Sequence, residues 1–346
     1  MPNGKEVFEE TDVTVAAENS GKIYAVGAGV GVSPDSLAAN GTVAINRGNN
    51  NLEAIIGDYG STHTNITNAE NISVVANDSS SLLGIAGGVG ISRQVAVGGS
   101  VAYNEIGNIS GNEDGKKQQN TAQINNAVIT TANGDTTADG VKINVGAFDN
   151  AKLTTAAVGV GVAAGNGVGV AVQGAAATAL INKDTEASMS GVSITKQNTS
   201  GKGADVVVEA DSNNSILTTA DTASVAVGST AVAVGAGVAV NRSEAGVKAL
   251  VSGGSMNVNN LEVNAANSAA IETIGIGGSV AGGMGAGVTG SVAVNMIGND
   301  TTAKIDGGAD ITAENNVVVD AQSDEQIANY AAVLQLLRRA RQLVFP

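Results

Sequence analysis

Few side chains in this chain are of the types that carry out catalytic or metal chemistry. The sequence holds one histidine, His63, and no cysteine. Paired-histidine and thiolate metal sites are therefore excluded, because both need ligands that the chain lacks. His63 lies in the polar segment GSTHTNIT, which we expect to be a solvent-facing turn rather than part of a Ser-His-Asp triad.

The carboxylates are the remaining candidates for acid–base or Ca²⁺ chemistry. Asp300, Asp306 and Asp310 flank one repeat, and Glu113 and Asp114 fall in a polar insertion. An enzymatic site on a repeat fold needs such acids clustered beside a partner base or a bound Ca²⁺. No basic residue recurs at a matching repeat position, so we expect solvated loops here. The sequence predicts no catalytic residue, no cofactor and no metal site, and a polysaccharide-acting enzyme stays a minor alternative.

A short phrase, in which an asparagine follows an apolar–x–apolar run, recurs along the chain. It ends at Asn46, Asn104, Asn182, Asn241 and Asn295, with spacings of 58, 78, 59 and 54 residues. Side-chain amides that stack on neighbouring strands can hydrogen-bond to one another. We therefore predict a structural asparagine ladder with four members: Asn182, Asn241, Asn264 and Asn295. The alternative is that these residues only start turns.

A second phrase of the same form interleaves with the first and includes Glu209, Asn264 and Asp320. Between Asn182 and Asp320, successive polar positions of the two phrases are 23 to 32 residues apart. We interpret the long repeat of about 55–60 residues as two half-units of about 27 residues, each forming one structural turn. The chain would then contain about 11–12 turns.

The residues between these polar positions are typical of strands. Apolar residues alternate with polar or small ones, and segments such as GNNN at 48–51 and DGG at 306–308 punctuate them. The same alternation in 156–181, the most apolar stretch, favours buried strands over a membrane helix. Hydrophobic residues make up 43% of the chain and aromatic residues only 2%, so the interior must stack small side chains. The sequence predicts an all-β fold, a parallel β-helix (β-solenoid), over residues 1–327.

The last residues differ from the repeat. Residues 328–346, ANYAAVLQLLRRARQLVFP, predict a short amphipathic helical tail with three arginines, Arg338, Arg339 and Arg341. Such a helix suits a cap for the solenoid or a basic surface helix at a membrane. The alternative is that the tail is the product of a frameshift or truncation.

Charge and composition exclude further classes. The net charge is −15 and the pI is about 4.4, which argues against nucleic acid as a partner. Abundant aliphatic residues with only 14% charged residues argue against intrinsic disorder. The absence of cysteine suits a secreted bacterial protein. No leader segment is seen at the N-terminus, which predicts a fragment of a longer exported parent.

The segment GIGGSVAGGMGAGVTGSVAVNMIGNDTTAKIDGGADITAENNVVVDAQSDEQ at 275–326 carries a resemblance to a known family. It resembles the repeat region of filamentous-haemagglutinin-like adhesins and leukotoxins that are exported by type V secretion, as autotransporters or two-partner systems. The resemblance extends over about residues 1–327. It implies a right-handed parallel β-helix passenger at a Gram-negative cell surface, and an outer-membrane translocator as partner of the full-length parent.

The resemblance implies attachment or host-cell damage as the function. We expect a non-enzymatic extracellular rod of a surface adhesin, which contacts a host-cell or matrix receptor, either protein or glycan, and has no stable membrane span. The alternative is a leukotoxin-like passenger that damages host-cell membranes. In that case the Gly/Val-rich segments 156–181 and 274–297 would be the inserting parts.

Overall fold

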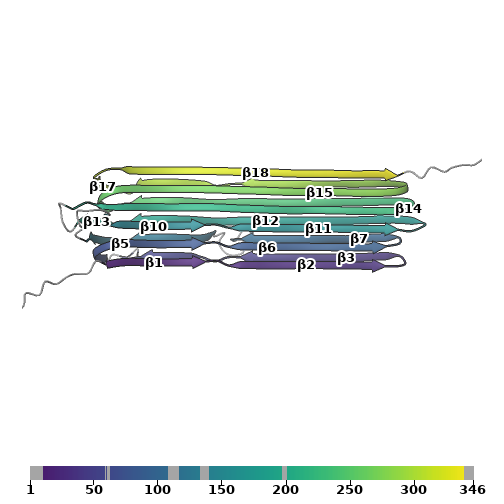
Figure 1. The fold of residues 1–346 in the computed structure, drawn as a ribbon, viewed down its shortest axis with the longest axis horizontal. Helices are drawn as coiled ribbons and strands as arrows, with labels where there is room; N and C mark the ends of the chain where they lie inside the picture. The colour runs from purple at the N-terminus through teal and green to yellow at the C-terminus, as the bar shows by residue number, and fades with distance from the viewer. Residues whose placement is uncertain are drawn as a thin grey trace, which may run out of the picture.

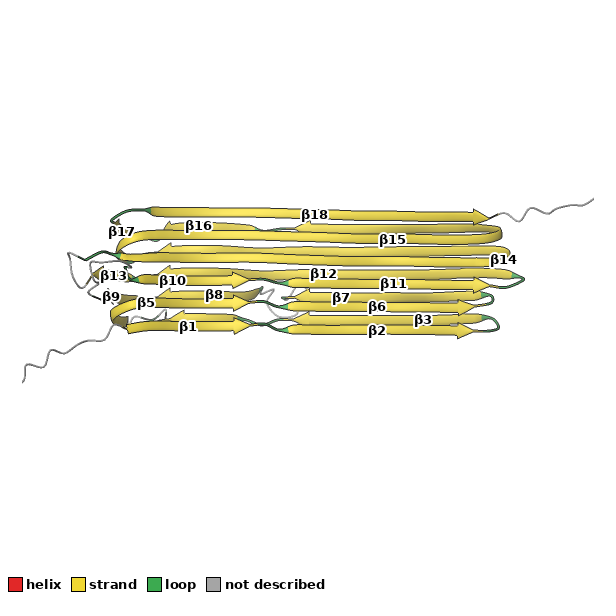
Figure 2. Ribbon diagram, viewed as in Figure 1, coloured by secondary structure: helices red, strands yellow, loops and turns green. Residues whose placement is uncertain are grey.

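A computed structural model describes residues 11–58, 60, 63–107, 117–132, 140–196 and 201–338. Strands make up most of this part of the chain, and no helix is found in it (Figure 2). Every strand pairing among the described residues is parallel, and all the strands belong to one large sheet. The all-β prediction is confirmed, and the arrangement is consistent with a β-solenoid.

Each repeat of the fold, called a rung below, has an outward leg and a return leg. In the first rung the outward leg is β1 (Thr11–Asn19) and β2 (Lys22–Ser33), and the return leg is β3 (Leu37–Gly48) and β4 (Leu52–Ile56). Figure 1 shows this course repeated from the purple N-terminal rung to the yellow C-terminal strand. The chain reverses direction within each rung, but legs that pair between rungs run in the same direction.

The later rungs use longer and less interrupted strands. The second and third rungs contain β5 (Thr64–Asp78), β6 (Ser81–Ser92), β7 (Val95–Ile106), β8 (Gln118–Asn125), β9 (Ala127–Thr131), β10 (Lys142–Asp149), β11 (Lys152–Ala164), β12 (Val168–Ser190) and β13 (Ser193–Lys196). The remainder consists of β14 (Ala204–Ser252), β15 (Ser255–Ile297), β16 (Asp300–Asp306), β17 (Asp310–Ala313) and β18 (Val317–Arg338). Because β14 and β15 each span an outward and a return leg, the chain needs few loops here.

The pairing register corrects the predicted 27-residue turn. Paired residues on neighbouring rungs lie between 54 positions apart, as for Asn241 and Asn295, and 75 positions apart, as for Val95 and Val170. The half-units are the two legs of one rung, and they face each other instead of pairing edge to edge. The expected 11–12 turns are therefore replaced by about half as many rungs, because each rung uses both half-units.

The predicted helical tail is also corrected. β18 continues without a break to Arg338, and Val317–Arg338 pair in register with Leu261–Gly282 of β15. Ile327, Asn329 and Ala331 pair with the inward residues of β15 and continue their columns. Strand pairing with β15 therefore decides the structure of this segment, although its local pattern favours a helix. Residues 339–346, with Arg339 and Arg341, lie outside the described residues. The polar insertion that contains Glu113 and Asp114 also lies outside them.

The interior divides the rungs into two halves of different composition. The valine–isoleucine half, on the β1, β5 and β10 side, encloses a cluster of Val, Ile, Met, Leu and Ala side chains. The glycine–alanine half comprises residues 22–48, 81–106, 152–181, 215–243, 271–297 and 327–338, and most of its interior clusters are formed of alanine alone. A few larger residues, such as Leu82, Ile181 and Ile271, fill the junction between the halves. The small interior side chains explain how the fold manages almost without aromatic residues.

Candidate functional site

The outer faces of the glycine–alanine half carry apolar side chains. One column on the return legs contains Val43, Val101, Val238 and Val292, whose exposed fractions are 62%, 43%, 41% and 58%. On the outward legs Val26, Val30 and Val32 are exposed in the first rung, and Tyr330, Leu334 and Leu336 are exposed in β18. The small residues of these strands point inward, so alternation places the branched residues outside. Large exposed apolar patches mark contact surfaces on soluble proteins.

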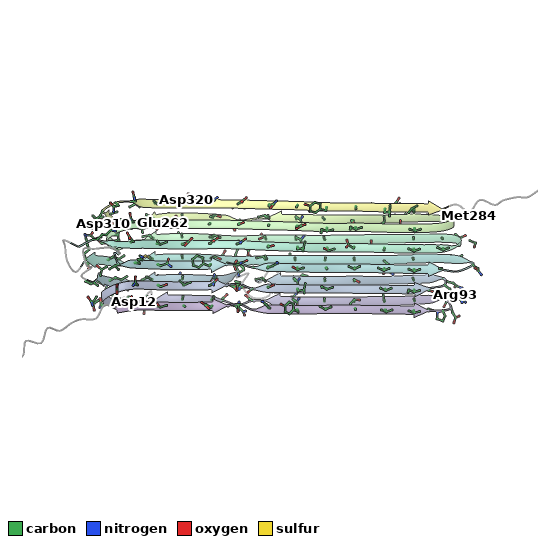
Figure 3. All side chains as sticks on the ribbon, in the orientation of Figure 1. Asp12, Arg93, Glu262, Met284, Asp310 and Asp320 are labelled. Carbon is green, nitrogen blue, oxygen red and sulfur yellow. The ribbon has the colours of Figure 1, made fainter. Side chains whose placement is uncertain are left out.

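Charged residues are few in the glycine–alanine half, where the apolar outer faces lie. In the described part of the glycine–alanine half the charged residues are Lys22, Asp35, Arg47, Arg93, Glu105, Lys152, Asp221, Arg242, Glu272 and Arg338. Most acidic residues lie in the valine–isoleucine half. Figure 3 shows Asp12, Glu262, Asp310 and Asp320 in that half, with Arg93 and Met284 at the opposite end. The molecule therefore has one acidic half and one apolar, weakly charged half.

Two hollows on the surface are lined mainly by polar groups. One, of about 430 Å³, lies on the return legs and is lined by Glu53, Gln123, Asp184, Glu186 and Lys248, among others. Lys117 Nζ lies 3.0 Å from Asp184 Oδ1 at its rim, and both side chains are about one-third exposed. Another surrounds the turns at Ser36, Arg93 and Gly165. Neither hollow combines an apolar lining with converging polar groups, which is the usual character of a small-molecule site.

The carboxylates that the sequence singled out do not converge. Asp300 pairs with Gly246, Asp306 with Ser252 and Asp310 with Ser255, which are three different register positions. Lys304 and Ser252 donate hydrogen bonds that lower the pKa of Asp306, which keeps this carboxyl ionised. Among the described residues, no group of three or more His, Cys, Asp or Glu side chains is placed to hold a metal ion. Glu113 and Asp114 lie outside the described residues, and His63 is exposed just before β5.

The four residues of the predicted asparagine ladder fall into three different columns. Asn241 and Asn295 are register partners, and Asn241 Nδ2 donates a hydrogen bond of 2.8 Å to Asn295 Oδ1. Asn182 pairs with Glu244, three positions beyond the column that holds Asn241. Asn264 faces outward, pairs with Glu209 and Asp320, and hydrogen-bonds Glu262.

The true column is Asn46, Asn104, Ala179, Asn241 and Asn295. Asn46 Nδ2 donates to Asn104 Oδ1 at 2.9 Å, so the ladder forms at both ends and is interrupted at Ala179. Threonines on the facing outward legs also hydrogen-bond to the asparagines of this column. Thr218 Oγ1 donates to Asn241 Oδ1 at 2.6 Å, and Asn241 Nδ2 donates to Thr273 Oγ1 at 2.8 Å. This network ties the two legs together inside the molecule, and its role is structural.

A buried ionic cluster, which the sequence interpretation missed, lies at the junction of the two halves. Lys183, on a return leg, has a fully buried side chain. Its Nζ lies 2.6 Å from Asp78 Oδ2 and also contacts Asp149 Oδ1. Asp78 and Asp149 are register partners on neighbouring outward legs, and both are buried. Two buried carboxyl groups thus share the side-chain nitrogen of one lysine.

The two carboxylates have different environments. Asp78 accepts hydrogen bonds from Asn19 Nδ2 at 2.8 Å, Ser80 Oγ at 2.7 Å and Gln118 Nε2 at 2.9 Å. These donors, together with Lys183, hold the carboxyl group of Asp78 in place. Asp149 accepts one weaker bond, from Ser212 Oγ at 3.3 Å. Burial raises the pKa of Asp149, and the attraction of Lys183 only partly opposes that effect.

Strand parity is the signal that would have revealed this cluster. Lys183 follows Ala179 and Ile181 at every second residue and therefore shares their inward face. Asp78 and Asp149 likewise follow the inward alanines Ala76 and Ala147. The sequence interpretation treated charged residues as solvated and did not follow the alternation through them.

Among the described residues, no helix is long and apolar enough to cross a membrane. Comparisons with protein-family models, with curated proteins and with solved structures found no match to the chain.

Proposed function

We propose that the chain is a non-enzymatic extracellular rod of a bacterial surface adhesin, a passenger fragment that mediates attachment. The observation that supports this most is the pair of apolar outer faces on the glycine–alanine half. A folded chain that exposes Val26, Val43 and Val292 to water has a surface suited to contact with another molecule. The family resemblance adds the cell surface as its location and type V secretion as its route.

The finer features of the fold belong to the same proposal. The rungs, whose register partners lie 54 to 75 positions apart, form a right-handed β-solenoid built from stacked outward and return legs. Stacking leaves long flat faces, which suit recognition of a large partner. The acidic half, which contains Asp12, Glu262 and Asp320, stays hydrated and keeps the rod soluble.

The receptor is a host-cell or matrix molecule, and the outer faces favour a protein over a glycan. Their side chains are mostly valine and isoleucine, which bury apolar area but offer no hydrogen bonds to sugar hydroxyls. Backbone groups of inner rungs are already paired within the sheet. Binding is then expected to depend on apolar area spread over several rungs.

Binding of the purified chain to host cells and to immobilised matrix proteins tests the proposal. The variant Val101→Thr/Val238→Thr/Val292→Thr keeps β-branched side chains but makes three of the four valines in the outer column polar. Val207→Thr/Val318→Thr makes the same change on the outward face of the other half and serves as the control. We expect the first variant to lose at least tenfold in affinity and the second to bind like the parent. Equal binding by all three proteins would contradict the proposal.

A second candidate is the leukotoxin-like passenger that damages host-cell membranes. The observation that favours it is that 156–181 and 274–297 both lie in the glycine–alanine half, with Val158, Ile276 and Val288 exposed. Release of dye from liposomes by the purified chain separates the two functions. An adhesive rod leaves the vesicles intact, whereas a membrane-damaging passenger releases the dye and loses this activity in the Val→Thr column variant.

A further inference from the structure

The buried cluster of Lys183, Asp149 and Asp78 brings an amine, a carboxyl group and a second carboxyl group together without water. We propose that Lys183 and Asp149 become joined by an intramolecular amide bond, with Asp78 as the proton carrier. The product is a covalent link between β12 on a return leg and β10 on an outward leg. This inference does not depend on the proposed function in adhesion.

The geometry already brings the reacting atoms close. Lys183 Nζ contacts Asp149 Oδ1, and the same nitrogen lies 2.6 Å from Asp78 Oδ2. A nitrogen in hydrogen-bond contact with a carboxyl oxygen is near the separation of roughly 3–3.5 Å to the carboxyl carbon from which attack occurs. Both aspartates project from one face of neighbouring rungs, and the lysine reaches them from the facing leg.

The environments of the two carboxyl groups assign their roles. Three neutral donors and the lysine surround Asp78, which hold its carboxyl group beside Lys183 Nζ in a position to accept a proton from it. In the described part of the chain, the side chains that contact the Asp149 carboxyl group are the lysine and Ser212, and burial raises the pKa of Asp149. The proposed step starts from the protonation state with no net charge, namely a carboxylic acid at Asp149, the form that burial favours, a carboxylate at Asp78 and an ammonium at Lys183.

The step balances in atoms and charge. The ammonium of Lys183 gives one proton to the Asp78 carboxylate, and the free amine attacks Cγ of Asp149. A C–N bond forms, and the C–OH bond of Asp149 breaks as Asp78 relays a proton from the nitrogen to the departing hydroxyl. The products are one amide with a single N–H, one water molecule and Asp78 as a neutral carboxylic acid. No oxidant, reductant or cofactor is needed.

Burial favours the product in two ways. Holding amine and acid together replaces a bimolecular encounter, which is worth an effective concentration of about 10⁵–10⁸ M in well-oriented systems. The side chains of Lys183 and Asp149 are both 0% exposed, so little water is present to reverse the reaction. The reaction also removes the buried ammonium and carboxylate, which are costly to keep inside a protein.

The mass of the intact full chain tests this proposal. We expect the folded protein to be lighter than its sequence mass by one water. Trypsin digestion under denaturing conditions should then show no cleavage after Lys183, and a branched peptide should join residues 143–152 to 153–196. The full sequence mass, with a free 153–183 peptide, would overturn the proposal. A branch to residues 48–93, which contain Asp78, would overturn the assignment of the two aspartates.

Substitutions at the cluster test which residues react and which one carries the proton. Lys183→Ala and Asp149→Ala should each have the full mass expected for their sequence. Asp78→Asn, which removes the proton carrier, should slow or abolish the loss of water. Lys117→Ala, at the exposed Lys117–Asp184 pair, is the matched control and should still lose one water. Loss of water by Asp78→Asn at the parent's rate would overturn the role of Asp78. The parent's own mass decides the proposal even if a core variant fails to fold.

Discussion

Truncation of Asn241 is expected to destabilise the protein strongly, whereas truncation of Asn264 is not. Asn241 is fully buried and makes three side-chain hydrogen bonds: to Thr218, Thr273 and Asn295. At about 1 kcal/mol net for each bond, the variant Asn241→Ala should lose about 3 kcal/mol of unfolding free energy. The fold itself accepts alanine in this column at Ala179, so the variant is expected to fold.

Asn264→Ala is the matched control. Asn264 belongs to the same sequence phrase but faces outward, where its truncation should cost less than about 0.5 kcal/mol. Unfolding in guanidinium chloride, followed by far-ultraviolet circular dichroism, measures the loss of unfolding free energy for both variants. The loss is calculated from the shift of the unfolding midpoint, with the same dependence on denaturant concentration for all proteins. Similar losses for the two variants, or a loss below about 0.5 kcal/mol for Asn241→Ala, would refute the interior asparagine–threonine network.

Three further substitutions test the interior and the surface charge. A Cβ on Gly84 would lie 2.7 Å from Asn104 Oδ1, so Gly84→Ala should cost about 1–3 kcal/mol in thermal unfolding, whereas Gly87→Ala, which meets no atom within 4 Å, should cost nothing. Both amide atoms of the buried Gln173 lack a hydrogen-bond partner in the described part of the chain, so Gln173→Met should hold or raise the guanidinium midpoint, and a clear decrease would show that the amide is paired. Burial and then acidic neighbours raise the pKa of Glu209, so its ionisation costs stability as pH rises from the ordinary glutamate pKa through the raised one. Glu209→Gln should therefore reduce the fall in melting temperature between acidic and neutral pH, and an unchanged pH profile would contradict this.

Much of the fold could be predicted from alternation and repetition. Period-two patterns identified the strands, and the recurrence of Asn46, Asn104, Asn241 and Asn295 marked the true rung. The error lay in treating each half-unit as a turn. Outward and return legs both alternate small inward residues with polar or branched outward ones, and nothing in that pattern shows where the chain reverses direction. Only the pairing register separates the legs.

The sites were predicted less well because they depend on which residues face inward. Asn182 and Asn264 share the phrase of Asn241 but not its column, since each strand's parity and leg decide where an asparagine points. By residue type, Lys183 does not differ from the other lysines of the chain. Its inward position follows only when the alternation of β12 is continued from Ile181. The apolar outer faces were missed for the same reason, because valine is usually assigned to the core.

The size of the rung is the central claim about the fold, and cross-linking of introduced cysteines tests it most directly. The chain has no cysteine of its own, so two introduced thiols react only with each other. Ser215 and Ala270 are register partners, about 4.8 Å apart as neighbouring strands. Arg242 lies 27 residues after Ser215, on the return leg. A short thiol–thiol cross-linker should join Ser215→Cys to Ala270→Cys within one chain and leave Ser215→Cys/Arg242→Cys unjoined. The opposite result would contradict rungs of about 55 residues and restore the 27-residue turn.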